Sequence, residues 1–427
     1  MKERMKNNAH LIEECLNGIH SDQSDFVPLV LERILAEAAR SEASDAHFQP
    51  AKNGMEVRFR QDGVLHVLGM LPQELTAQFA ARLKVLANLL TYQIAVPQEG
   101  RIRSGVVPGV DKEMRVSTVP TLYGERVVVR FFSEETRYQY ADELGLPPDI
   151  RDRLLQAARR NSGAILLTGP SGSGKTTTAY ALLRELADRG ETTRSIVTLE
   201  DPIEHALEGI AQVEIRRQND LTLDAMIKYM MRQDPEVLFV GEIRDRATAE
   251  AAMQAALTGH LLITTFHAGS AAESVGRLYE IGIEPFALRS GISCVLCQRL
   301  VRKLCPVCAE KHTDGIALTI GREHCVAGRS VTAPFEITEY SFPKGCGQCN
   351  GTGYAGRVLL AESLPLENVV CPEYRNANVM RALFDRPDMQ AIGELAVQNG
   401  MIPMSVRAVA LIESHVTSPQ EIRRVFG

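Results

Sequence analysis

Hydrophobic and polar positions follow two different patterns along the chain, and the pattern changes near residue 134. In the first part apolar residues recur at helical spacing in some segments and alternate with polar residues, as in strands, in others. Helices are expected at 26–39 and 75–90, and strands at 56–60, 64–68, 114–118 and 126–132. The turn at Asp62-Gly63 between two of these strands is typical of a hairpin. We therefore predict an α+β domain with an antiparallel sheet at 26–133, preceded by a weakly ordered lead-in at 1–25.

The second part alternates between strands and helices, after a polar linker at 134–145 that has neither period. Strands are expected at 164–168, 195–199, 237–240 and 261–265, and helices at 176–187, 222–232, 246–257 and 271–280. This order predicts an α/β core with a doubly wound sheet at 146–303. A helix from Pro285 to about Lys303 is expected to end the core. A cysteine-rich element at 304–357 and a helical segment at 358–427 follow.

The composition is that of a soluble globular protein of 427 residues, with 45% hydrophobic and 23% charged residues. A chain of this length is expected to form two or three domains. The net charge of −6 argues against a surface that coats nucleic acid. No tract approaches the roughly 18 apolar residues of a membrane span, and the first residues lead into no signal-peptide core. We therefore expect a cytosolic protein whose nine cysteines are thiols or metal ligands rather than disulfides.

One stretch fits the phosphate-loop pattern G-x-x-x-x-G-K-[ST] and lies between an expected strand and an expected helix. Its glycines allow a tight turn that points successive backbone N–H groups and a helix N-terminus at a phosphate. Lys175 adds a positive charge, and the hydroxyl of Thr176 is a ligand for Mg²⁺. The predicted ATP or GTP site comprises Gly169, Pro170, Ser171, Gly172, Ser173, Gly174, Lys175, Thr176 and Thr177.

Acidic residues and histidines stand at the ends of the other expected strands of the core. An acidic cluster with Glu204 follows the second strand, at the edge where parallel sheets bind ligands. Glu242 follows the third strand and is the expected Mg²⁺ carboxylate, because Gly241 occupies the place where an Asp is usual. His260 and His267 bracket the fourth strand, in a polar arrangement suited to sensing a γ-phosphate.

Four cysteines form two pairs with chelating spacing, Cys305 with Cys308 and Cys346 with Cys349. Soft thiolates at this spacing predict a tetrahedral Zn²⁺ site, which is structural because four thiolates leave no open coordination position. The alternative is four reduced thiols without a metal. Cys294 and Cys297 have the same spacing, but they lie in the expected helix after Pro285, where positions i and i+3 share one buried face. We therefore assign this pair to the core.

Several stretches together resemble the secretion ATPases of type II secretion and type IV pilus assembly (GspE/PilB-like). They are 198–204, 233–245 and 258–267 beside the phosphate loop, and 43–50, 57–63, 97–101 and 115–118 in the first part. The resemblance extends over residues 43 to about 360. It implies a RecA-like P-loop ATPase domain preceded by a small α+β, PAS-like domain. It also implies a homohexamer in which ATP hydrolysis is coupled to swivelling of the two domains.

The resemblance also assigns roles to the residues at the strand ends. It implies that Glu204 is the catalytic glutamate, which orients or deprotonates the attacking water, and that Glu242 is the Walker B acid. His260 and His267 match the two histidines of the family's His box.

Three arginines match arginines of the family. Arg101 and Arg115 match two that reach the phosphates from the first domain, and Arg232 matches one on the helix before the Walker B strand. An arginine delivered by domain closure stabilises the charge of the transferring phosphoryl group. Lys228 stands one turn before Arg232 where a second arginine is usual, so it keeps the charge but lacks the planar fork.

The implied setting is cytoplasmic and peripheral to the inner membrane, with a membrane platform protein and an adaptor as partners and no direct nucleic-acid binding. Assembly-type members carry the tetracysteine element, and retraction-type members lack it. Two alternatives stay open, a DNA-uptake or conjugation motor of the same superfamily and a nucleotide-gated scaffold that does not hydrolyse ATP. A zinc-ribbon helicase is disfavoured by the negative net charge and by the absence of Trp.

Overall fold

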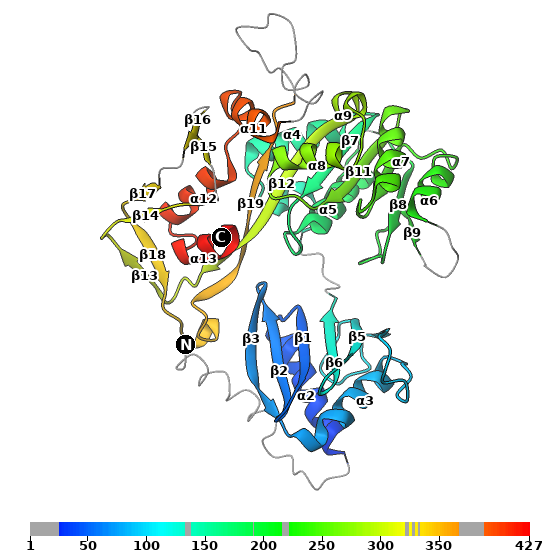
Figure 1. Ribbon diagram of the computed structural model, residues 1–427, viewed down its shortest axis with the longest axis vertical. Helices are drawn as coiled ribbons and strands as arrows, with labels where there is room; N and C mark the ends of the chain where they lie inside the picture. Colours follow the sequence, from blue (N-terminus) through cyan, green and yellow to red (C-terminus); the bar gives the residue numbers. More distant parts are fainter. Residues whose placement is uncertain are drawn as a thin grey trace, which may run out of the picture. The chain divides into compact units, whose positions relative to one another are not determined.

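The computed structural model describes residues 25–132, 138–190, 192–215, 222–320, 334–366 and 388–427, together with the backbone of 324–326 and 329–331. The chain forms two compact units, Met1–Thr136 and Arg137–Gly427 (Figure 1). The predicted lead-in up to residue 24 and the linker residues 134–137 lie outside the described residues.

The first unit is a six-stranded antiparallel sheet with strand order β3-β2-β1-β6-β5-β4 (Figure 1). Its elements are α2 (Phe26–Arg40), β1 (Asp45–Ala51), β2 (Gly54–Gln61), β3 (Val64–Leu71), η1 (Gln73–Leu75), α3 (Thr76–Leu86), β4 (Gln98–Ile102), β5 (Met114–Thr121) and β6 (Gly124–Phe131). Alternate strand residues such as Phe48 and Val57 form one buried core with Leu31 and Phe79 of the helices. The predicted antiparallel α+β architecture is confirmed, but β1 and β4 have no counterpart among the predicted strands.

The second unit contains a seven-stranded sheet with order β19-β12-β7-β11-β10-β8-β9. Its strands are β7 (Gly163–Thr168), β8 (Ile196–Glu200), β9 (Ala211–Glu214), β10 (Val237–Val240), β11 (Leu261–Phe266), β12 (Ile292–Leu304) and β19 (Tyr354–Ser363). Strand β19 pairs antiparallel with β12, and the other neighbours pair in parallel. Successive residues of one strand, such as Leu238 and Phe239, belong to two different buried clusters. Both faces of the sheet are therefore covered, which explains the nearly continuous apolar runs of its strands.

The described helices of this unit that precede β12 are η2 (Ala141–Leu144), α4 (Pro148–Ala158), α5 (Lys175–Asp188), α6 (Leu223–Met230), α7 (Arg246–Leu257), α8 (Ala271–Glu280) and α9 (Pro285–Gly291). Helices α5 to α8 alternate with the core strands in the predicted order, and η2 and α4 precede the first strand. The four strands and four helices predicted for the core are present. In the described part of the chain, no helix is both long and apolar enough to cross a membrane.

Two helix predictions are wrong, and a third helix ends earlier than predicted. The segment from Pro285 to Lys303 forms the short helix α9 and then strand β12, because a buried apolar run fits either structure and pairing with β7 and β19 selects the strand. The segment 358–427 begins inside strand β19 rather than in a helix. Helix α6 ends at Met230, so Arg232 lies beyond it and not on its face one turn after Lys228.

In the part of the chain after Leu304 that the structure describes, a long hairpin and three helices complete the second unit. The hairpin consists of the antiparallel pairs β13 (Ala309–His312) with β18 (Tyr340–Pro343), β14 (Ile316–Leu318) with β17 (Phe335–Ile337), and β15 (His324–Val326) with β16 (Arg329–Val331). After η4 (Gly347–Cys349) and β19 come α11 (Met389–Gln398), α12 (Met404–Glu413) and α13 (Pro419–Phe426). Leu318 and Ile337 of the hairpin share a buried cluster with Ile412 of α12, so the hairpin is packed on the C-terminal helices.

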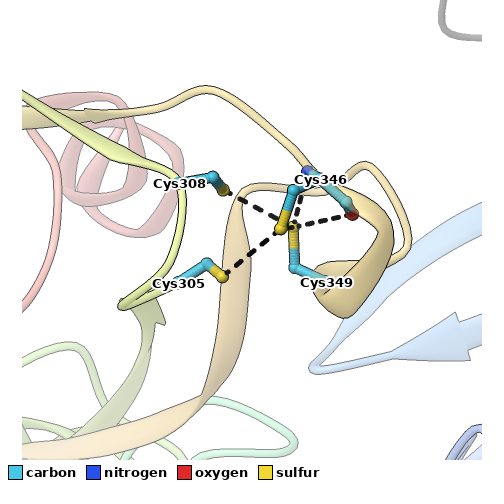
Figure 2. A group of neighbouring side chains, drawn as sticks. All are labelled: Cys305, Cys308, Cys346 and Cys349. Atoms are coloured by element: carbon cyan, nitrogen blue, oxygen red, sulfur yellow. Dashed lines mark hydrogen bonds between the residues drawn. The ribbon is translucent and has the colours of Figure 1, made fainter.

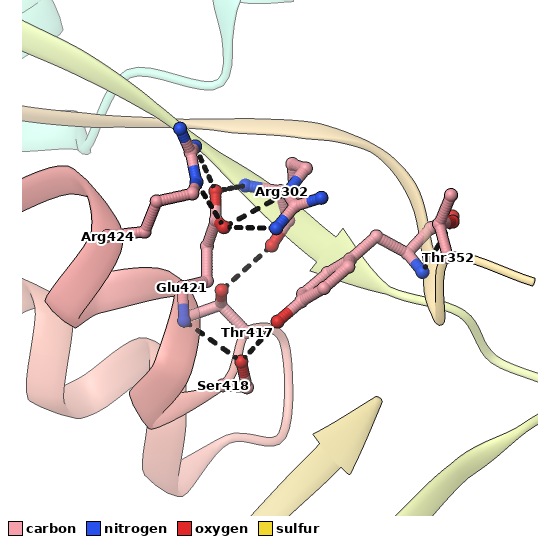
Figure 3. Close-up of polar contacts among 7 residues, drawn as sticks. Arg302, Thr352, Thr417, Ser418, Glu421 and Arg424 are labelled. Carbon is pink, nitrogen blue, oxygen red and sulfur yellow. Dashed lines mark hydrogen bonds and ion pairs between the residues drawn. The ribbon is translucent and has the colours of Figure 1, made fainter. Parts of the chain in front are cut away.

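A buried ion-pair network joins α13 to the sheet (Figure 3). The Glu421 carboxylate accepts hydrogen bonds from Nε and Nη2 of Arg302, at 2.9 and 2.8 Å, and from Arg424. Burial by itself would raise the pKa of Glu421, but these hydrogen bonds outweigh it and lower the pKa. Ser418 bonds the hydroxyl of Tyr354 at 2.6 Å. The network holds α13 against β12 and β19 next to the cysteine pairs.

Candidate functional site

The phosphate loop connects β7 directly to α5, as its sequence predicts. Gly169, Gly172 and Gly174 have φ values of +141°, +74° and +89°, in the region that favours glycine. At Gly169 a Cβ atom would lie 2.2 Å from the carbonyl oxygen of Gln298 on β12. The turn therefore requires glycine both for its backbone conformation and for the close approach of the neighbouring strand.

Lys175 and Thr176 begin helix α5 at the end of this loop. The Lys175 ammonium is buried and donates to the carbonyl oxygens of Gly169 and Pro170, at 2.9 and 3.0 Å. Burial lowers the pKa of Lys175, while the nearby Glu242 carboxylate acts in the opposite direction. Thr176 is exposed, so its hydroxyl is accessible to a ligand. The charge and the hydroxyl that the phosphate-loop pattern calls for thus lie side by side at the helix N-terminus.

The strand order places the other candidate groups at neighbouring strand ends. The phosphate loop follows β7, His267 follows β11, Glu242 follows β10, and the loop with Glu204 follows β8; these four strands are adjacent and parallel. The carboxylate of Glu242 lies 2.6 Å from Nε2 of His267 and also pairs with Arg244. The structure therefore brings the predicted phosphate loop, acids and second histidine to one edge of the sheet, where such sheets bind ligands.

A buried network that the sequence does not reveal supports the Glu204 loop. Tyr180 on α5 donates its hydroxyl hydrogen bond to the buried carboxylate of Glu200, which also accepts from Thr198 at 2.6 Å. The same hydroxyl accepts a hydrogen bond from the backbone N–H of Glu204 at 3.3 Å. Burial and the Glu200 carboxylate raise the pKa of Tyr180, so it keeps the proton that it donates. Helix α5 and the Glu204 loop are thereby linked through one side chain.

Two predicted residues do not join this group. His260 precedes β11, whereas His267 follows it, so the six-residue strand separates their backbones by about 20 Å. Nδ1 of His260 lies 3.2 Å from the carbonyl oxygen of Ala255 at the end of α7. Arg232 is exposed beyond the end of α6, with its guanidinium over the ring of Tyr229. Within this unit, neither His260 nor Arg232 lies at the carboxyl ends of the strands, where the nucleotide motifs are located.

Arg101 and Arg115 lie in the first unit on strands β4 and β5. They are direct cross-strand partners and therefore project from the same face of the sheet. Each has an acidic neighbour, Glu113 at 3.2 Å from Arg101 and Glu99 at 2.6 Å from Arg115. The two guanidinium groups thus form a partly exposed basic pair held by carboxylates.

The four predicted metal ligands lie together (Figure 2). The sulfur atoms of Cys305, Cys308, Cys346 and Cys349 all lie within 4.8 Å of one another. Three of their separations are 3.7 to 3.9 Å. A tetrahedral ion with Zn–S bonds of about 2.3 Å holds its sulfurs about 3.8 Å apart, so the cluster has the dimensions of a zinc site.

The backbone around the cluster favours thiolate ligands. The N–H groups of Cys346 and Gly353 point at the sulfur of Cys349, at 3.2 and 3.1 Å, and the N–H of Gly345 points at Cys308 at 3.3 Å. Burial disfavours a charged Cys349, but the N–H donors lower the pKa of this thiol to about 7. Burial acts in the opposite direction on the neighbouring Cys308 thiol and raises its pKa to about 12. An N–H-supported thiolate at pH 7 is the form that binds a metal.

Cys294 and Cys297 are buried as predicted, but they are buried in a strand and not in a helix. Both lie on strand β12 and belong to different clusters on the two faces of the sheet. They cannot chelate one ion together. Burial raises the pKa of Cys294 to about 11 and that of Cys297 to about 12, so both remain neutral thiols in the core.

In the second unit a glycine-rich loop connects β7, a strand within the parallel part of the sheet, to helix α5. This arrangement defines an α/β domain of the phosphate-loop class. Residues 20–408 match the family described as Type II/IV secretion system protein, and the chain belongs to this family. The family predicted from the motifs is thus confirmed.

Several curated relatives carry names from secretion and pilus systems. The chain is 43% identical over 343 residues to the Type II secretion system protein E of Pseudomonas aeruginosa, covering 80% of this chain and 66% of that protein. It is 36% identical to the Type IV pilus assembly ATPase TfpB of Acinetobacter baylyi, covering 93% of this chain and 65% of that protein. The chain therefore spans about two thirds of the length of these relatives.

Two solved structures share the fold. The ATPase DotB of Legionella pneumophila matches with a TM-score of 0.68 at 20% identity, covering 95% of this chain and 98% of that chain. The pilus retraction motor PilT with bound ADP matches with a TM-score of 0.59 at 22% identity, covering 92% of this chain and 96% of that chain. These likenesses show a mixed α/β ATPase fold.

Proposed function

We propose that the protein hydrolyses ATP and uses the energy to drive pseudopilus or pilus assembly in a type II secretion or type IV pilus system. The observation that carries the proposal is the convergence of Lys175, Glu242 and His267 with the Glu204 loop on four adjacent strand ends. The family membership and the names of the relatives support the biological setting.

The residues of the site divide the chemistry between them. Backbone N–H groups of residues 171–176 and the Lys175 ammonium bind the phosphates, and Thr176 with Glu242 would hold Mg²⁺. When bound, Mg²⁺ offsets the charge of the phosphate oxygens. Glu204 takes the proton of the attacking water or orients it, and His267 holds Glu242 in place while its exposed ring is available to sense the γ-phosphate.

Basic side chains from outside the strand edge complete the proposed site. Arg101 and Arg115 are the candidates for stabilising the transferring phosphoryl group, which would couple a movement of the first unit to hydrolysis. Arg232 and His260 lie away from the strand edge in their own unit. If they act on a nucleotide, as the family resemblance implies, it would be that of a neighbouring subunit in the proposed homohexamer.

The tetracysteine cluster is proposed to hold one structural Zn²⁺. Its thiols have tetrahedral spacing and backbone N–H donors, and four thiolates leave no position open for catalysis. The ion would clamp the base of the hairpin that starts at Cys308 and ends at Cys346.

The wider setting belongs to the same proposal. The protein acts as a homohexamer in the cytoplasm, peripheral to the inner membrane, on a membrane platform protein through an adaptor. A DNA-uptake or conjugation motor would keep the same catalytic site and differ in the partners. A scaffold that binds but does not hydrolyse ATP is disfavoured because Lys175, Glu204 and Glu242 are all retained.

ATP hydrolysis by the purified protein, compared with Glu204→Gln, tests the proposal. We expect Mg²⁺-dependent turnover that falls by about 10²-fold or more in the variant, with about one zinc per chain in both proteins. The exposed Glu208 lies in the same loop, so Glu208→Gln is the matched control and should retain turnover. Equal and near-zero rates in all three proteins, at saturating ATP, would favour the scaffold.

A further inference from the structure

Glu362 is a buried acid on β19 that joins two helices from distant parts of the chain. Only 6% of the residue is exposed. Its Oε1 accepts a hydrogen bond from the backbone N–H of Ala271, the first residue of α8, at 2.9 Å. Its Oε2 accepts one from the backbone N–H of Met404, the first residue of α12, also at 2.9 Å. One carboxylate thus satisfies free donors at two helix N-termini, where a negative charge is favourable.

Helix α8 is the element that fixes the loop after β11. Arg277 on α8 donates to the carbonyl oxygen of His267 at 2.8 Å, and Glu273 accepts from the N–H of Gly269 at 2.8 Å. Ser274 bonds the hydroxyl of Thr168, the last residue of β7, at 3.0 Å. The first turns of α8 therefore contact both the His267 loop and the start of the phosphate loop.

The other helix, α12, belongs to the C-terminal segment. Its Arg407 pairs with Asp149 of α4 at 2.6 Å. A second link runs in parallel through Arg299 on β12, which donates to the carbonyl oxygens of Val425 on α13 at 2.8 Å and of Gly269 at 3.4 Å. The C-terminal helices and the His267 loop thus share anchors in β12 and β19.

We propose that Glu362 is a positioning residue for the nucleotide site, which holds α8 and thereby the His267 loop in register with the C-terminal helix α12. The inference rests on the proposed hydrolysis of ATP at the strand edge. Glu362 touches no reacting atom. A rearrangement of the C-terminal helices would move the N-terminus of α8 through this carboxylate and change the contact between His267 and Glu242.

The variant Glu362→Gln tests the anchor with minimal change in shape, because the amide has one acceptor oxygen where two N–H groups need two. We expect kcat for ATP to fall about tenfold or more while KM changes little, since the phosphate loop itself is not altered. Glu421→Gln is the matched control. Glu421 is equally buried and also binds a backbone N–H, that of Arg302, but its contacts lie on the side of the cysteine pairs. It should lower the unfolding temperature, and kcat of the folded protein should fall less than in Glu362→Gln, because the link from α13 to the His267 loop through Arg299 includes the longer, 3.4 Å contact to Gly269.

Hydrogen exchange followed by mass spectrometry separates the inference from the proposed function. In Glu362→Gln, peptides covering 267–275 and 402–406 should exchange faster, and peptides within α7 should not. Unchanged exchange in 267–275 would overturn the inference, and so would faster exchange with an unchanged kcat. If the wild-type protein hydrolyses no ATP, the proposed function fails, and the exchange of 267–275 alone then decides whether Glu362 anchors α8. Should Glu362→Gln not fold, Glu362→Asp keeps the charge but is too short to reach both helices, and it is expected to show the same effects.

Discussion

The phosphate loop and the tetracysteine cluster are two ligand sites built in opposite ways. The loop is one continuous stretch whose binding groups are mainly backbone N–H donors, shaped by glycines and by a helix N-terminus. The cluster draws its ligands from side chains 41 residues apart along the chain. A change in the loop should therefore affect chemistry and leave the fold intact, whereas a change in the cluster should affect the fold first.

Lys175→Met should give the largest effect. It removes the buried ammonium but keeps the length and apolar part of the side chain, so ATP hydrolysis should fall by about 10³-fold and the unfolding temperature should hardly change. Steady-state hydrolysis and thermal unfolding of the same sample measure the two quantities. Lys344→Met, an exposed lysine beside the cysteine cluster, is the control. A large loss of stability in Lys175→Met would contradict the distinction between the two sites.

Cys346→Ser should show the reverse behaviour. Loss of one thiolate ligand should abolish zinc binding and lower the free energy of unfolding by about 3 kcal/mol, while ATP affinity of the folded protein stays the same. Zinc content and urea unfolding of wild type and variant are the measurements. If the variant lost its zinc but kept its stability, the cluster would not be a structural clamp.

Tyr180→Phe tests whether side chains matter on the nucleotide side as well. Removing the hydroxyl leaves the buried Glu200 carboxylate without one donor and the Glu204 N–H without its acceptor. An unsatisfied buried group costs about 1–3 kcal/mol, so we expect kcat to fall about tenfold with a smaller change in KM. Tyr229→Phe, which alters an exposed tyrosine, should have no effect. Equal kcat values for both variants would mean that the Glu204 loop needs no such support.

Local patterns predicted the parts of the molecule that depend on local structure. The phosphate loop, the alternating strands of the core and the cysteine pairs are each specified by residues close together in sequence. Strand β12 could not be distinguished from a helix because its apolar run is buried on both sides, and its strand form is selected by pairing with β7 and β19. The contacts of Glu362 and Gln298 could not be predicted either, because their partners lie 91 and 125 residues away along the chain.

Cys294→Ala should give the smallest effect, and it separates the two cysteine pairs that spacing alone cannot distinguish. Cys294 lies on one face of the sheet and Cys297 on the other, and burial keeps both as neutral thiols. Truncating a buried thiol to a methyl group should lower the free energy of unfolding by about 1 kcal/mol and leave zinc content and ATP hydrolysis unchanged. Zinc analysis beside Cys346→Ser makes the comparison direct. Loss of zinc from Cys294→Ala would mean that β12 supplies a ligand, which requires the strand to leave its place beside β7.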